Sequence, residues 1–202
     1  MAAPGVAQRR EGLSNGMLGF ILFIASEVMF FGGLFAAYFI ARADSPQWPP
    51  TELLTADQIA AGVKLEAHWH LPLVGTILLI LSSITVQIGV FQIGKGNRSG
   101  LIWWLFISIV LGMVFLAIQM YDYAQLPFGA GDTVYGTTFY TLTGFHGAHV
   151  AGGVIFMTIV LVRAMGGQFD ARNHEAVEAA SFYWHFVDVV WIALFTTLYI
   201  VQ

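Results

Sequence analysis

Long apolar stretches separated by short polar segments dominate the sequence. Five stretches carry no Asp, Glu, Lys or Arg apart from Glu27 and Asp188, and they cover residues 12–41, 67–94, 99–121, 133–162 and 179–202. Each exceeds the about 20 residues that a helix needs to cross roughly 30 Å of hydrocarbon. The pattern therefore predicts an all-α integral membrane protein, with one membrane domain over residues 1–202. Its five transmembrane helices are expected at about 12–42, 67–94, 99–122, 133–163 and 177–201.

Composition supports the membrane class and excludes several others. Hydrophobic residues make up 57% of the chain and charged residues only 10%, whereas a soluble domain carries about 25% charged residues. The net charge of −4 is scattered, without a basic stripe, and this excludes nucleic acid as a partner. The chain has no cysteine. Disulfides, thiolate metal sites and iron–sulfur clusters are therefore excluded, and a redox metal would need His, Met or carboxylate ligands.

Basic residues near the ends of the stretches predict the orientation, because they favour the inner side of the membrane. An inner N-terminus places six basic residues inside and only two outside. The inner residues are Arg9, Arg10, Lys95, Arg98, Arg163 and Arg172, and the outer ones are Arg42 and Lys64. We therefore expect the N-terminus inside and the C-terminus outside.

The first stretch has one feature of a secretory signal peptide. Its end, Ala41-Arg42-Ala43, resembles a small-residue cleavage motif. However, the apolar run is about twice the usual 7 to 15 residues of a signal peptide. We expect this stretch to stay in the protein as a helix.

Glu27 lies in the middle of the first stretch, more than a dozen residues from the nearest charge in the sequence. An ionised acid at membrane depth costs roughly 2.5 kcal/mol or more, so it is rarely kept without a role. We expect a protonated, neutral acid. Two interpretations stay open: a proton-linked or lipid-contacting acid, and an acid that only hydrogen-bonds to another helix.

His146 and His149 lie three residues apart in the fourth stretch, on neighbouring parts of one helix face. Haem or copper ligation is one interpretation, but two ligands this close do not suit the two planes of a membrane cytochrome. The favoured alternative is that both rings hydrogen-bond to neighbouring helices. Gly144, Ala148 and Gly152 form a ridge of small residues on the same helix, which lets another backbone come close.

His185 and Asp188 are also three residues apart, in the last stretch, and are expected to pair on one face. Glu178 lies nearly three turns before Asp188, near the inner membrane surface. A catalytic diad would need a third group and a substrate pocket, and neither is visible. The sequence thus predicts a polar intramembrane network of His146, His149, Glu178, His185 and Asp188, with no catalytic, cofactor-binding or metal-binding residue.

Three motifs in these stretches resemble subunit III of haem-copper oxidases, the cytochrome c oxidase subunit 3 family. They are SEVMFF at 26–31, TGFHGAHV at 143–150 and EAASFYWHFVDVVW at 178–191. The stretch VYGTTFYTLTGFHGAHV at 134–150 extends the second motif, so the likeness covers nearly the whole chain. The chain resembles the five-helix bacterial form, which lacks the first two helices of the mitochondrial protein.

The resemblance implies an accessory subunit of a proton-pumping terminal oxidase that reduces oxygen to water. In this family the haem and copper lie in subunits I and II, which are the expected partners, and phospholipids bind between the helices. The family's buried acid corresponds to Glu27, its histidines to His146 and His149, and its last motif to Glu178, His185 and Asp188. One departure lies at Val86-Gln87-Ile88-Gly89, where mitochondrial relatives carry a histidine pair.

The resemblance favours cytochrome c as the electron donor and the bacterial cell (inner) membrane as the location. A quinol oxidase subunit III and a related subunit that accompanies a nitric oxide reductase are the alternatives. A stand-alone proton-linked transporter built around Glu27 would be expected to show broken helices or repeat symmetry, and the sequence shows neither.

Overall fold

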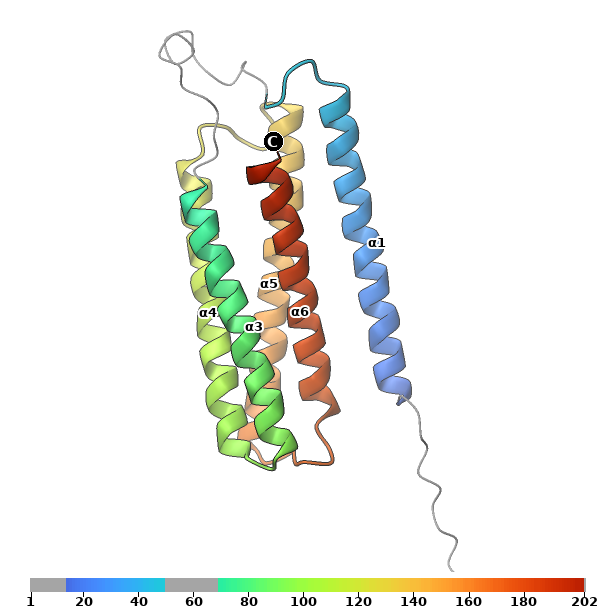
Figure 1. Cartoon of the computed structure of the whole chain (residues 1–202), viewed down its shortest axis with the longest axis vertical. Coiled ribbons are helices and arrows are strands. Elements are labelled where there is room, and N and C mark those ends of the chain that lie inside the picture. The colour runs from blue at the N-terminus through green and yellow to red at the C-terminus, as the bar shows by residue number, and fades with distance from the viewer. Residues whose placement is uncertain (1–13, 50–68, 202) are drawn as a thin grey trace, which may run out of the picture.

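The computed structural model describes residues 14–49 and 69–201, and these form five long helices and a π-helical turn (Figure 1). The elements are α1 (Asn15–Ala43), α3 (His70–Gly94), α4 (Arg98–Gln125), α5 (Val134–Met165), α6 (Glu175–Phe195) and η2 (Thr196–Ile200). With η2 continuing α6, all five helices are long and apolar enough to cross a membrane. The prediction of an all-α membrane protein with five spans is confirmed. Residues 12–13 and 67–68 of the predicted helices lie outside the described residues, as do Arg9, Arg10 and Lys64.

Polar side chains define where three of the helices begin. Ser14, Asn97 and Thr133 precede α1, α4 and α5, and the side-chain oxygen of each accepts a hydrogen bond from the backbone N–H three residues later, at 3.0 to 3.1 Å. Such caps satisfy one of the free N–H groups at a helix start. Gly96 has a φ of 77°, a conformation that favours glycine, and it allows the tight turn between α3 and α4.

Trp184 of α6 lies at the centre of the bundle formed by α3, α4, α5 and α6. Its indole is fully buried, and its Nε1–H donates to the hydroxyl of Ser82 on α3 at 2.8 Å. On two further sides it contacts glycines: a Cβ atom at Gly112 of α4 or at Gly153 of α5 would lie 2.7 Å from an indole carbon. The two glycines therefore make the space that this tryptophan fills.

Helix α1 packs against α5 and α6 at the side of this bundle (Figure 1). Most of its side chains are exposed in the single chain, and only Met17, Phe31 and Tyr38 are buried. Polar contacts fix both of its ends. Ser14 donates to the carboxylate of Glu175 at 3.0 Å, and Arg42 donates to the carbonyl of Val201 at 3.0 Å.

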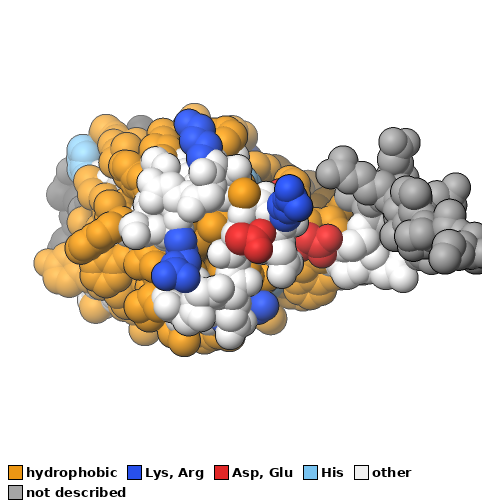
Figure 2. Space-filling view, turned by 90° about the horizontal axis from the view of Figure 1, so that it is seen from below, with side chains coloured by type: hydrophobic (Ala, Val, Ile, Leu, Met, Phe, Trp, Pro, Cys, Tyr) orange, Lys and Arg blue, Asp and Glu red, His pale blue; other side chains and the backbone are white. Residues whose placement is uncertain are grey.

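The two ends of the bundle differ in charge. Figure 2 views the end that carries the α3–α4 turn and the α5–α6 loop, where four basic residues lie: Lys95, Arg98, Arg163 and Arg172. Among the described residues, Arg42 is the one basic residue at the other end. In the α5–α6 loop, backbone N–H groups of Arg172 and Asn173 donate to Asp170 and lower the pKa of its carboxyl. This end therefore carries four of the five described Lys and Arg residues, and the orientation prediction uses this asymmetry in basic residues.

Candidate functional site

Glu27 of α1 and His149 of α5 meet near the middle of their helices, although 122 positions separate them in the sequence. The Oε2 atom of Glu27 lies 2.9 Å from Nε2 of His149. Their side chains are 20% and 15% exposed in the single chain. The acid that has no charged neighbour in the sequence therefore has a titratable partner in space.

The second ring nitrogen of His149 decides how protons are placed in this pair. Nδ1 lies 2.7 Å from the carbonyl oxygen of Phe145, which can only accept a hydrogen bond, so Nδ1 carries a proton. Glu27 and Nε2 of His149 then share one further proton. The pair is either a carboxylic acid that donates to a neutral imidazole or a carboxylate that accepts from an imidazolium. Both arrangements have no net charge, which makes the pair tolerable at membrane depth.

Aromatic groups from two helices surround the pair. The ring of Phe31 meets the His149 ring edge-on at 4.9 Å between centroids, and Phe30 stacks on it at 6.2 Å. From α6, the hydroxyl of Tyr183 donates to the backbone carbonyl of His149 at 3.2 Å. The Glu27–His149 pair is thus a junction of α1, α5 and α6 that can hold a proton beside apolar walls.

His146 has a different environment from His149, although it lies less than one turn away. It is fully buried, and its ring stacks on Trp191 at 4.9 Å and meets Phe115 edge-on at 5.8 Å. Neither ring nitrogen has a hydrogen-bond partner among the described residues. The expectation that both histidines bond neighbouring helices is wrong for His146. On a helix, two side chains three residues apart point in directions that differ by about 60°. This difference is enough to direct His146 into the core while His149 faces α1.

His185 bridges α6 and α3. Its Nδ1 lies 2.5 Å from the hydroxyl of Ser83, and its Nε2 lies 3.1 Å from Oε1 of Gln87. Because an amide oxygen only accepts, Nε2 carries the proton and Ser83 donates to Nδ1. Ser181 lies within 3.2 Å of Nε2 and completes the set. A neutral imidazole satisfies all of these contacts.

The predicted pairing of His185 with Asp188 is wrong. The carboxyl oxygens of Asp188 have no hydrogen bond to any described residue, although Ser83 lies near them. The imidazole is already occupied by groups on α3, which face it across the helix interface. Glu178 contacts His174 at 3.4 Å in the first turn of α6 and is 42% exposed, so it also lies apart. The five predicted residues therefore do not form one connected network.

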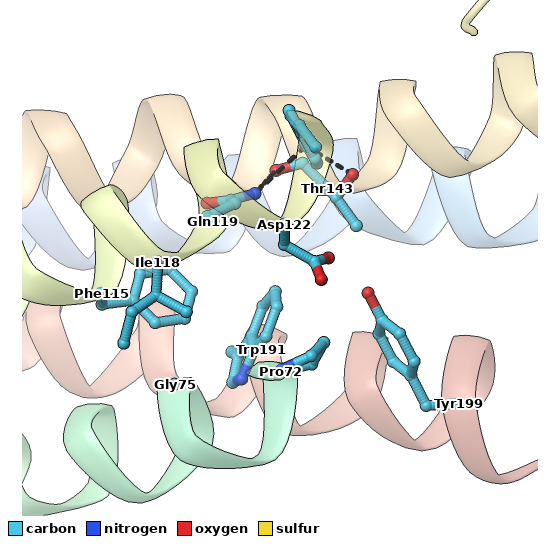
Figure 3. A pocket seen from close by; sticks show the side chains of 10 residues that line it. Pro72, Gly75, Phe115, Ile118, Gln119, Asp122, Thr143, Trp191 and Tyr199 are labelled. Carbon is cyan, nitrogen blue, oxygen red and sulfur yellow. Dashed lines mark hydrogen bonds between the residues drawn. The ribbon is translucent and has the colours of Figure 1, made fainter. Parts of the chain in front are cut away.

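A polar cluster that the sequence did not predict lies between α4 and α5, and Figure 3 shows Gln119, Asp122 and Thr143 of it. Gln119 donates to the carbonyl of Thr143 at 2.8 Å and to the hydroxyl of Tyr123 at 3.2 Å. Tyr123 donates to the Thr143 hydroxyl at 2.7 Å. Asp122 is only 6% exposed beside them. The charge-free stretch ends at residue 121 and the helix is predicted to end at about residue 122, but α4 continues to Gln125 and Asp122 lies in the interior.

Comparison with known proteins resolves the family. The family model described as "Cytochrome c oxidase subunit III" matches residues 7–202. The chain belongs to the cytochrome c oxidase subunit III family. A relative from Nocardia farcinica, named "Probable cytochrome c oxidase subunit 3", is 41% identical over 100% of this chain and 98% of its own length. "Cytochrome c oxidase subunit 3" of Thermostichus vulcanus is 40% identical over 91% of this chain and 86% of its own.

Some subunit III relatives are longer than this chain. "Cytochrome c oxidase subunit 3" of Rhizopus stolonifer is 42% identical over 94% of this chain, which spans 64% of that protein. Membership agrees with the resemblance carried by the three motifs. It identifies a multi-pass membrane protein of a respiratory oxidase family.

Two features of this subunit III chain bear on its chemistry. In the described part of the chain, no three His, Asp or Glu side chains converge as they do in a metal site. At the departure in α3, Val86 is buried, while Gln87 provides the amide oxygen that faces His185. The segment without the histidine pair therefore still contributes a polar contact to α6.

Proposed function

We propose that the chain is the accessory subunit III of a proton-pumping terminal oxidase of the cytochrome c oxidase type. The complex would take electrons from cytochrome c and reduce oxygen to water in aerobic respiration. Subunits I and II would be the partners and would hold the haem and copper. Family membership and the names of the relatives support this assignment.

The proposed location is the bacterial cell (inner) membrane, with the N-terminus inside and the C-terminus outside. Among the described residues, Lys95, Arg98, Arg163 and Arg172 lie at one end and Arg42 at the other. The positive-inside rule places the end with four basic residues in the cytoplasm. Helices α4 and α6 then begin at the inner side.

The Glu27–His149 hydrogen bond is the observation that carries the proposed role in proton uptake. The pair holds one shared proton without net charge, and it lies on α1, the helix whose surface is least covered in the single chain. A proton-holding group at membrane depth can influence the hydration and the proton affinity of groups in an adjacent subunit. We therefore assign it to support of the catalytic subunit, without a step in the oxygen chemistry.

Lipid binding is the second part of the proposed role. A groove with a volume of about 420 Å³ opens between α4 and α5 at membrane depth. Its walls include Leu116, Met120, Gly144, Gly147 and Ala148. Gly144 and Ala148 of the predicted ridge lie in this wall, and their small side chains leave the groove open. The space beside Gly144 is empty, since a Cβ atom there would meet nothing within 4 Å. An acyl chain of a phospholipid suits such an apolar surface.

Comparison of three forms of the purified oxidase tests the role: the intact complex, the complex stripped of this chain, and the complex with Glu27→Gln. The stripped form should still consume oxygen at a substantial initial rate, because no metal ligand has been removed. It should lose activity after fewer turnovers or pump fewer protons per electron. Glu27→Gln should reproduce part of the pumping or endurance defect while the chain stays bound.

Two results would contradict the proposal. Immediate and complete loss of oxygen consumption, with haem and copper content unchanged, would mean that the chain takes part in the chemistry. Identical turnover lifetime and proton stoichiometry in intact and stripped enzyme would mean that it supports neither.

The donor is tested separately, by adding reduced cytochrome c or a quinol to the complex that copurifies with the tagged chain. Oxygen consumption with the quinol and none with reduced cytochrome c would show that the donor is a quinol.

A further inference from the structure

The end of the last span contains a π-helical turn that sets the position of Tyr199. In η2 (Thr196–Ile200) the hydrogen bonds reach one residue further than in an α-helix, and the N–H of Val201 donates to the carbonyl of Thr196, five residues back. Such turns are rare and are often found at functional sites. The extra residue changes the face on which Tyr199 lies. Its side chain is directed toward α4 (Figure 3).

Asp122 of α4 faces this tyrosine. Figure 3 shows the carboxyl group of Asp122 and the hydroxyl group of Tyr199 turned toward one another across a gap. Asp122 is 6% exposed. A buried carboxyl group at this depth needs polar surroundings, and the hydroxyl group of Tyr199 is a polar group that faces it.

A small cavity adjoins both side chains. It has a volume of about 10 Å³, and its lining includes Asp122 and Tyr199 together with Gln119, Phe115 and Trp191. This volume is near the smallest that holds one water molecule, about 10 to 15 Å³. A buried water also needs two to four polar partners. The carboxyl group of Asp122 and the phenol of Tyr199 supply two polar partners, so the cavity meets both conditions.

We propose that this cavity binds one ordered water molecule, which hydrogen-bonds to the carboxyl group of Asp122 and the hydroxyl group of Tyr199. The water joins the last turn of the final span to the polar cluster of Gln119, Tyr123 and Thr143 on α4 and α5. A lipid chain is too large for this space. A metal cation such as Ca²⁺ would need six or more oxygen ligands, more than this lining supplies.

Radiolytic hydroxyl labelling of the intact oxidase tests the site, because radicals formed from a bound water oxidise the side chains beside it. Phe115 and Trp191 line the cavity and carry oxidisable rings. Phe139 is the matched control, because it is fully buried and does not line the cavity. Phe115 and Trp191 should be oxidised severalfold more than Phe139 by mass spectrometry. When the enzyme is transferred into water enriched in the heavy oxygen isotope shortly before irradiation, the bound water should be replaced slowly. The oxygen added to Phe115 and Trp191 should then contain less of the heavy isotope than the oxygen added to surface residues.

Two variants connect the label to the proposed ligands. Asp122→Leu fills the polar side of the cavity, and Tyr199→Phe removes one hydroxyl with little change in shape. Both should reduce labelling of Phe115 and Trp191 to the level of Phe139. If Asp122→Leu fails to assemble, Tyr199→Phe and the exchange measurement on the wild type still decide. Labelling of the cavity residues at the Phe139 level in the wild type would overturn the proposal, as would unchanged labelling in assembled Tyr199→Phe enzyme.

Discussion

Glu27 and His149 approach to 2.9 Å and place a shared proton between α1 and α5. Helix α1 buries few of its side chains in the single chain, so this contact, with the polar contacts at its two ends, is a main link to the rest of the bundle. The same pair is therefore both a packing contact and a proton-holding group. Variants of Glu27 can separate these two properties.

Glu27→Gln and Glu27→Leu should differ in how firmly this chain is held in the oxidase complex. The glutamine amide can donate to Nε2 of His149 and keep a neutral hydrogen bond, whereas leucine leaves that nitrogen without a partner. Loss of one member of a buried pair costs about 1 to 3 kcal/mol. We expect Glu27→Leu to lower the amount of this chain retained on the detergent-purified oxidase, with Glu27→Gln close to wild type. Equal retention in all three forms would show that the pair contributes nothing to packing.

A hydrophobic carbodiimide should modify Glu27, because it reacts with a protonated carboxyl group that can be reached from lipid. Separating charges in hydrocarbon is costly, which favours the acid–imidazole arrangement over the ion pair. Mass spectrometry should find the adduct in the wild type and not in Glu27→Gln. His149→Leu should also be labelled. An adduct that appears only in His149→Leu would show that the wild-type pair is ionised.

Gly153 and Gly144 lie on the same helix and should respond oppositely to alanine. A Cβ atom at Gly153 would lie 2.7 Å from the indole of Trp184, while one at Gly144 would meet nothing within 4 Å. Overpacking a core costs about 1 to 3 kcal/mol, so Gly153→Ala should lower the melting temperature of the purified oxidase subunit. Gly144→Ala should leave it unchanged or slightly higher. A matching loss in both variants would mean that glycine is needed for the helix itself and not for Trp184.

The sequence predicts the spans well because membrane helices must be long, apolar and uncharged over most of their length. The same rule ended the third predicted helix too early, at about residue 122, because it treats a charged residue as the end of a span. The spacing of Gly112, Phe115, Gln119 and Asp122, all buried on one face of α4, would have extended the helix correctly.

Side-chain partners were harder to predict than spans. Glu27 and His149 are 122 positions apart, and no local pattern in either segment specifies that α1 packs on α5. For His185 the sequence instead suggested a contact that is not formed. Its proximity to Asp188 in sequence suggested a pair, but a helix surface offers several neighbours, and the imidazole bonds to Ser83 and Gln87 of α3 instead. Proximity along a helix indicates which contacts are possible, and packing selects among them.

Variants of His185 and Asp188 test this assignment directly, because the two residues lie less than one turn apart on α6. His185→Leu keeps an apolar side chain in the interface but leaves Ser83 and Gln87 without their partner. These contacts are part-buried, so their loss should cost a part of the about 1 to 3 kcal/mol of a fully buried unsatisfied group, and retention of the chain on the purified oxidase should fall. Asp188→Asn keeps the shape and leaves the His185 contacts intact, so retention should stay near wild type. If Asp188→Asn reduced retention as strongly as His185→Leu, the two side chains would have to act as the pair that their sequence spacing suggested. The bridge from α6 to α3 would then be assigned to the wrong residue.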